Sequence, residues 1–190
     1  MGNSVNTNVG ALIALQNLNQ TNAELATTQS RINTGKRINS AKDNGAIWAI
    51  AQNQRASSKA LDAVRESLQR GQSTVDVAIS AGETVSDLLV QMKEKALAAA
   101  DSSLDTTSRA SLNEEFVALR GQLAKAVSTA DFNGVNMVKS GGTTIASLAN
   151  SDATSKITVA AQSLALGGAN VTVSATATIN TVTAATAMIA

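Results

Sequence analysis

Apolar residues recur at alternating intervals of three and four over most of the first 130 residues. In residues 11–32 the recurring positions are Leu15, Leu18, Asn22, Leu25, Gln29 and Ile32. This is the spacing of a coiled-coil seam, in which polar members lower stability but fix the register against a partner. The pattern predicts an amphipathic helix over residues 11–32 that is only marginally stable alone in water.

A longer stretch, residues 57–99, keeps the same alternation throughout. Its seam positions are Leu61, Val64, Leu68, Gly71, Val75, Ala78, Gly82, Val85, Leu89, Met92, Ala96 and Ala99. A single helix of this length is about 65 Å long at about 1.5 Å per residue, so it cannot fold back to bury its own stripe. The alternation breaks at residues 101–107 and then resumes at Leu112, Phe116, Leu119, Leu123, Ala126 and Ala130. We therefore predict a mainly α fold, a long helical hairpin or coiled-coil rod.

The pattern changes after residue 130. Residues 131–134, Asp-Phe-Asn-Gly, contain an Asn-Gly pair suited to a tight turn with positive φ. No charged residue follows Lys156, and residues 157–160 and 171–179 alternate Thr or Ser with Val, Ala or Ile. These two segments flank Gly167-Gly168, and their alternation predicts that they form a β-hairpin or small sheet. Its uncharged surface is expected to be either a solvated outer face or a contact surface.

The connector between the first two predicted helices reads RINTGKRINSAKDNGA, residues 31–46. Arg31 falls in the last turn of the first helix, and Gly35 is suited to a left-handed cap just beyond it. Ser40 and Asp43 have the S-x-x-D spacing of a capping box, ahead of the apolar residues 47–50. The connector is therefore expected to end one helix and cap the next.

The same connector resembles the signature near the N-terminus of bacterial flagellins, in particular the alphaproteobacterial ones. Residues 15–18, Leu-Gln-Asn-Leu, resemble the family's terminal helix, and residues 132–135, Phe-Asn-Gly-Val, resemble the turn that closes its second rod helix. The three matches occur in the family's order. The resemblance implies an inner-tube helix and spoke over 1–46, a helical rod over 47–136, and an outer β element with the start of a returning segment over 137–190.

The family pattern also contains a C-terminal half whose helices return through the rod. Nothing in this sequence resembles that half, although residues 183–189 are expected to open such a helix. We therefore interpret the sequence as the N-terminal half of a filament subunit. A fragment, a truncated form and a naturally short family member all remain open.

The resemblance implies a structural subunit of the bacterial flagellar filament, secreted to the cell exterior, that assembles through coiled-coil packing and supports motility. The implied partners are other flagellin subunits, a flagellar export chaperone, the filament cap and hook-junction proteins. The side chains expected at assembly contacts are Leu15, Leu18, Leu25, Ile32, Arg31, Arg37, Asn39, Asp43, Leu61, Val64, Leu68, Val75, Val85, Leu89, Met92, Leu112, Phe116, Leu119 and Leu123.

Composition argues against other classes of function. The chain has no His and no Cys, which are common metal ligands, general bases and nucleophiles. We therefore expect no enzymatic activity, no metal site and no cofactor. The net charge of +1 and the aromatic content of 2% do not favour nucleic-acid binding. No apolar run approaches the roughly 18 residues of a membrane span.

Two alternatives stay open on sequence grounds. One is a secreted, non-polymerising protein that docks its rod helix into a partner's groove; a helical monomer at high concentration would favour it. The other is a hook-filament junction protein that shares the terminal helices. The intact connector and the Phe-Asn-Gly turn favour the filament subunit.

Overall fold

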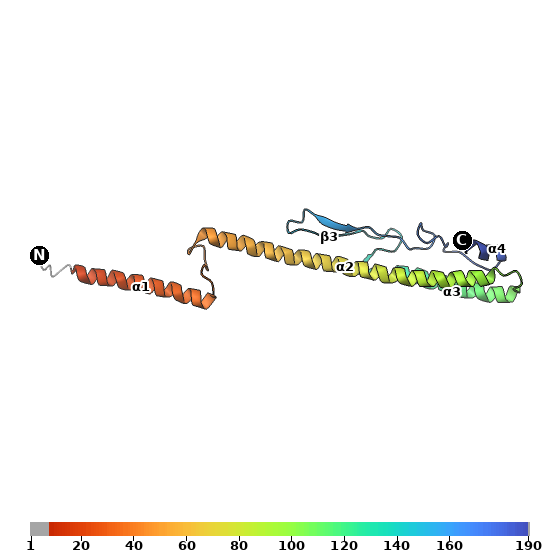
Figure 1. Ribbon diagram of the computed structural model, residues 1–190, viewed down its shortest axis with the longest axis horizontal. Helices are drawn as coiled ribbons and strands as arrows, with labels where there is room; N and C mark the ends of the chain where they lie inside the picture. The colour runs from red at the N-terminus through yellow and green to blue at the C-terminus, as the bar shows by residue number, and fades with distance from the viewer. Residues whose placement is uncertain (1–7, 190) are drawn as a thin grey trace. The chain divides into compact units, whose positions relative to one another are not determined.

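The computed structural model describes residues 8–189, and Figure 1 shows their arrangement in helices and short strands. Within this range the elements are α1 (Val9–Thr34), α2 (Gly45–Ala99), α3 (Thr106–Thr129), β1 (Asp131–Phe132), β2 (Val135–Asn136), β3 (Ile145–Leu148), β4 (Lys156–Val159) and α4 (Val182–Ala187). The chain divides into an N-terminal unit, Met1–Lys59, and a C-terminal unit, Ala60–Ala190. Helix α2 contributes to both units. The predicted class, mainly α with a small β element, is confirmed.

Helix α1 follows the prediction closely and extends it by two residues at each end. The Asn8 side chain caps its start by accepting a hydrogen bond from the Ala11 backbone N–H at 3.2 Å. Arg31 lies in its last turn, and Gly35 caps its end with φ 63°. Glycine adopts this left-handed backbone conformation easily because it has no Cβ. Both predicted end signals are therefore confirmed.

The start of α2 differs from the prediction. Asp43 Oδ2 accepts hydrogen bonds from the backbone N–H groups of Asn39 and Ser40, each at 3.0 Å. These bonds close a turn within the connector instead of capping the helix. The Asn44 side chain is the cap, since its Oδ1 accepts from the Ile47 backbone N–H at 3.1 Å. The predicted Ser40–Asp43 capping box was wrong because Asn44, directly before α2, is also a strong capping residue.

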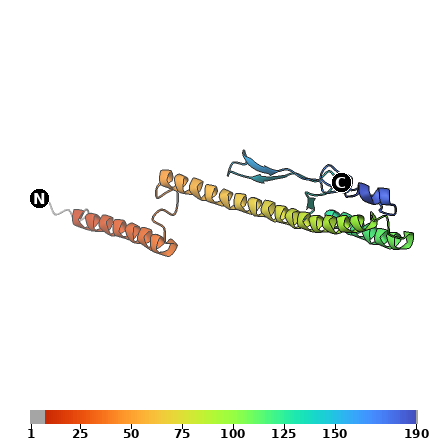
Figure 2. The same cartoon turned by 45° about the vertical axis from the view of Figure 1, so that its right-hand side comes forward.

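In the C-terminal unit, α3 runs antiparallel beside α2, as Figures 1 and 2 both show. Asp105 caps α3 by accepting from the Ser108 N–H at 2.7 Å. Across the two helices the Lys95 ammonium pairs with the Glu115 carboxylate at 2.7 Å. The shared core contains Val85, Met92, Phe116 and Leu123, each at most 3% exposed. The predicted return helix is confirmed.

The turn after α3 also forms as predicted. β1 and β2 pair antiparallel, with Phe132 opposite Val135. Between them Asn133 and Gly134 have φ of 51° and 78°, the left-handed pair that suits a two-residue hairpin loop. Next to it, the buried Asn136 side chain donates to the Val127 carbonyl at 2.8 Å and accepts from the Val138 and Lys139 N–H groups, each at 2.9 Å. This side chain ties the hairpin to the end of α3.

The outer β element has a different pairing from the predicted one. β4 covers most of the predicted strand 157–160, but its antiparallel partner is β3, with Ser147 opposite Ile157. Figure 1 shows β3 beside α2, where the Leu148 N–H donates to the Ser67 hydroxyl at 3.1 Å. The predicted pairing of 157–160 with 171–179 was therefore wrong.

Residues 171–179 form no strand and instead lie along the helical hairpin. Val171, Ala177 and Ile179 are buried in the core that α2 and α3 share. The Ile179 N–H donates to Asn113 Oδ1 at 2.8 Å, and the Arg120 guanidinium donates to the Ala177 carbonyl. Helix side chains thus satisfy two backbone groups that a strand partner would otherwise bind. The chain then enters α4, which overlaps the helix expected over 183–189.

A pair of Gly→Ala substitutions compares the packing just after the β1–β2 hairpin with the packing on α3. A Cβ on Gly142 would lie 2.8 Å from the Met137 carbonyl oxygen, whereas one on Gly121, within α3, would meet nothing within 4 Å. We expect Gly142→Ala to destabilise the protein by about 1–3 kcal/mol through overpacking. Gly121→Ala should stabilise it by up to about 1 kcal/mol through helix propensity. Urea unfolding followed by circular dichroism measures both, and shifts of the same sign would contradict this packing.

Candidate assembly interface

Helix α1 presents its apolar side chains to solvent. The predicted contact residues Leu15, Leu18, Leu25 and Ile32 are 55%, 57%, 54% and 75% exposed. Among the residues of α1 that the structure describes, none is buried. A helix with so much exposed aliphatic surface is typical of an element that packs against another protein chain. This surface is the first part of the candidate interface.

The connector brings three of the predicted polar residues together. Arg31, Asn39 and Asp43 line one shallow pocket with the last turns of α1, while Arg37 is exposed outside it. The backbone N–H groups of Asn39 and Ser40 lower the pKa of the Asp43 carboxyl, and the positive charge of Arg31 acts in the same direction. The ionised carboxylate therefore holds the connector turn together.

This turn should depend on pH in a defined direction. Because the folded-state pKa of Asp43 lies below its ordinary value of 3.8, the turn gains stability from the carboxylate above that pH and loses it as the pH falls through the lowered folded value. We expect amide hydrogen exchange at Asn39 and Ser40 to accelerate on acidification below about pH 4, relative to exchange in the middle of α3. An Asp43→Asn variant should show no such acid-dependent change. Unaltered relative protection in the parent would contradict the role of Asp43.

The predicted contact residues of the C-terminal unit fall into three groups. Five of them are buried inside the unit: Val64, Val85, Met92, Phe116 and Leu123. Four are half-buried: Val75, Leu89, Leu112 and Leu119. The other two, Leu61 and Leu68, are 57% and 37% exposed. Four of the buried residues, Val85, Met92, Phe116 and Leu123, belong to the core of the helical hairpin, and Val64 is buried outside that cluster. The free apolar surface of this unit therefore has to include other residues besides Leu61 and Leu68.

That free surface is a second apolar row on α2, of which the sequence analysis identified only Leu61 and Leu68. Ile79, Val90 and Leu97 are 55%, 67% and 63% exposed, and they continue the row begun by Leu61 and Leu68. The five residues follow one another at intervals of 7, 11, 11 and 7. At about 100° per residue these intervals keep them within about 40° of one another around the helix axis. We call these five residues the outer stripe; the 7- and 11-residue spacing is the signal that could have revealed it.

Other kinds of site find little support in the described part of the chain. Over residues 8–189, no group of three or more His, Cys, Asp or Glu side chains is placed to hold a metal ion. The helices of the same range include none that is long and apolar enough to cross a lipid bilayer. The exposed rows on α1 and α2 remain the most distinctive surfaces.

Comparison with known proteins agrees with these features. The profile of the bacterial flagellin N-terminal helical region matches residues 5–143. The chain is 58% identical to flagellin FljM of Caulobacter vibrioides over 98% of its own length and 67% of FljM, and 60% identical to FljN of the same organism over 87% of its length and 60% of FljN. Flagellin C of Rhizobium meliloti is 38% identical over 73% of the chain and 42% of that protein. The chain thus spans about two thirds of the length of its Caulobacter relatives, and it belongs to the bacterial flagellin family of flagellar filament subunits.

Proposed function

We propose that this chain builds the flagellar filament by packing α1 against other flagellin subunits outside the cell. The observation that carries the proposal is the exposure of α1, whose apolar side chains find no burial within residues 8–189. Fully burying one Leu or Ile side chain is worth about 1.5–3 kcal/mol. A few such contacts per subunit offset the loss of translational and rotational freedom on assembly.

We propose a separate role in the filament for each of three consecutive segments of the chain. Residues 1–46 form the inner-tube helix and spoke, residues 47–136 the rod, and residues 137–190 the outer element. Support comes from the different surfaces of the three segments. α1 is exposed all round, α2 and α3 share a core, and β4 is exposed at every position.

The exposed helix also motivates the accessory partners. A subunit that leaves its apolar α1 surface uncovered before assembly is prone to premature association. We therefore propose that an export chaperone covers this surface inside the cell. A cap protein at the filament tip and junction proteins at the hook complete the proposed set, on the strength of the family resemblance alone.

Incorporation into filaments tests the proposal. The tagged chain is expressed in a Caulobacter strain that lacks its own flagellins, and sheared filaments and culture medium are probed separately. We expect the parent chain in filaments. The variant Leu18→Asp/Leu25→Asp should be exported to the medium but depleted from filaments at least tenfold, because assembly would bury unpaired charges.

The matched control places the same charges on the other side of α1. Gln20 and Thr27 lie about 140–180° from Leu18 and Leu25 at about 100° per residue, and both are exposed. Gln20→Asp/Thr27→Asp should incorporate better than the Leu variant. Absence of the parent chain from filaments would refute the proposed function. Equal incorporation of both variants would refute the role of the Leu face.

A further inference from the structure

The outer stripe lies on the side of α2 opposite the internal core. The core-facing residues Val85, Leu88 and Met92 are buried, and at about 100° per residue they project roughly 120–180° away from the centre of the stripe. Leu61, Leu68, Ile79, Val90 and Leu97 are therefore separate from the seam that packs the helical hairpin. Within residues 8–189 all five remain exposed, from 37% at Leu68 to 67% at Val90.

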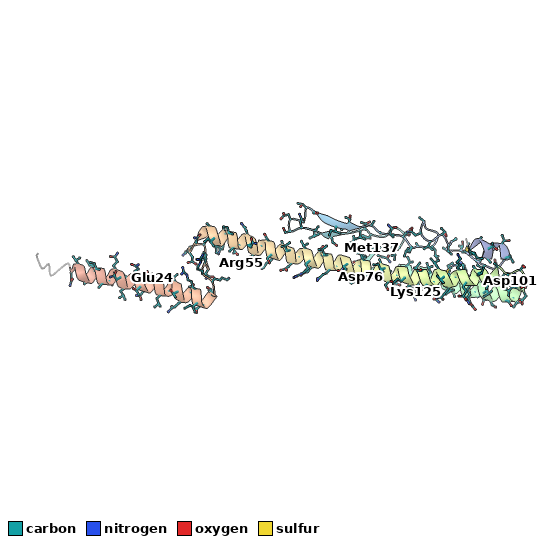
Figure 3. All side chains as sticks on the ribbon, viewed as in Figure 1. Glu24, Arg55, Asp76, Asp101, Lys125 and Met137 are labelled. Atoms are coloured by element: carbon teal, nitrogen blue, oxygen red, sulfur yellow. The ribbon has the colours of Figure 1, made fainter. Side chains whose placement is uncertain are left out.

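A row of carboxylates follows one edge of the stripe. Asp76, Glu83, Asp87 and Glu94 are exposed and lie about 40–80° around the axis from the stripe; Figure 3 labels Asp76. None of the four takes part in the ion pairs found within residues 8–189. We call these four residues the acidic rim. The other edge carries one cation, Lys93.

The charge of the two units is opposite in sign. Residues 1–59 contain six basic and two acidic side chains, a net charge of +4, whereas residues 60–190 contain nine basic and twelve acidic side chains, a net charge of −3. Four of the six basic residues of the N-terminal unit gather in residues 31–50: Arg31, Lys36, Arg37 and Lys42. The one acidic residue there, Asp43, is engaged by backbone N–H groups.

The same segment also carries exposed aliphatic side chains. Ile32, Ile47 and Ile50 are 75%, 41% and 66% exposed. We call residues 31–50, which comprise the connector and the start of α2, the basic connector. It pairs apolar groups with positive charge, whereas the outer stripe pairs apolar groups with negative charge. The two surfaces are complementary in both respects.

We propose that the outer stripe and acidic rim of one copy bind the basic connector of a second copy, an inference that rests on the proposed filament function. The aliphatic contacts supply affinity, and the opposed charges select the register and speed the encounter. Two different surfaces meet, so the contact is head-to-tail and leaves a free connector and a free stripe at the two ends. A contact of this type generates an open filament when its rotation does not close a ring.

Charge reversal with compensation tests the proposal. The rim variant is Asp76→Lys/Glu83→Lys/Asp87→Lys, and the connector variant is Lys36→Glu/Arg37→Glu/Lys42→Glu. All six positions are exposed, so circular dichroism should show parental helicity for both. In sedimentation assays we expect each variant alone to need at least tenfold more protein than the parent to assemble. An equal mixture should assemble within about twofold of the parent, because each connector then meets a rim of opposite charge.

A charge-matched control separates this contact from a general effect of net charge. Glu114→Lys/Asp131→Lys/Asp152→Lys changes the same number of exposed acidic residues away from α2 and should assemble like the parent. Parental assembly of either test variant alone, no recovery in the mixture, or an equal loss in the control would overturn the inference and leave the filament function standing. Failure of the parent chain itself to assemble would overturn both.

Discussion

Replacing Val85 by Asp is expected to unfold the helical hairpin of the C-terminal unit. Val85 is 3% exposed within the apolar core shared by α2 and α3. An unpaired carboxylate buried there costs several kcal/mol, a large share of the 5–15 kcal/mol that stabilises a typical protein. Urea unfolding followed by circular dichroism should show a large loss of stability and of helicity at 25 °C.

Val90 provides the matched control on the same helix. It is 67% exposed on the outer stripe, so Val90→Asp should change the free energy of unfolding by no more than about 0.5 kcal/mol. Comparable destabilisation by the two changes would mean that α2 does not bury its predicted seam.

Replacing Arg109 by Ala should have the second-largest effect. Arg109 is 8% exposed, and its Nε donates to the Ala99 carbonyl at 2.9 Å. Its Nη2 donates to the carbonyls of Asp101 and Leu104 at 2.8 Å and 3.0 Å. The side chain thus closes the end of α2 and the loop into α3. Since a hydrogen bond to a charged group is worth about 1.5–3 kcal/mol, we expect the variant to lose about 3 kcal/mol of stability.

Two further variants sharpen this test by thermal or urea unfolding. Arg109→Lys should recover little of the lost stability, because an ammonium lacks the planar fork that reaches three carbonyls. Arg65→Ala, which removes an exposed Arg paired with Asp62, should alter stability by about 1 kcal/mol or less. Full rescue by Lys would show that charge alone is required at residue 109.

The sequence predicted those parts of the fold that local interactions decide. The three-four spacing predicted α1, α2 and α3, and Gly35 and Asn133-Gly134 marked turns because their backbone conformations suit few other residues. The error at the start of α2 was also local. Asn44 and Ser40 are both good caps, and spacing alone did not show which of them adjoins the helix.

The remaining differences depend on contacts between distant residues. Residues 171–179 have the alternation of a strand, but Asn113 and Arg120 on α3 bind their backbone groups. The seam predicted contact residues without showing which would be covered by this chain, as Phe116 is, and which would stay free, as Leu61 does. Ile79, Val90 and Leu97 of the outer stripe were missed because a search for positions three and four apart passes over a row whose members are 7 and 11 residues apart.

Cysteine labelling tests the central claim, that assembly buries the exposed face of α1. The parent chain contains no Cys, so Leu18→Cys or Leu25→Cys gives a single reactive thiol. Thr154→Cys, in the exposed turn before β4, is the control. We expect all three variants to react rapidly with a maleimide as soluble subunits. In filaments, Leu18→Cys and Leu25→Cys should react at least tenfold more slowly, while Thr154→Cys keeps its rate; undiminished labelling of both α1 positions in filaments would contradict assembly through this face.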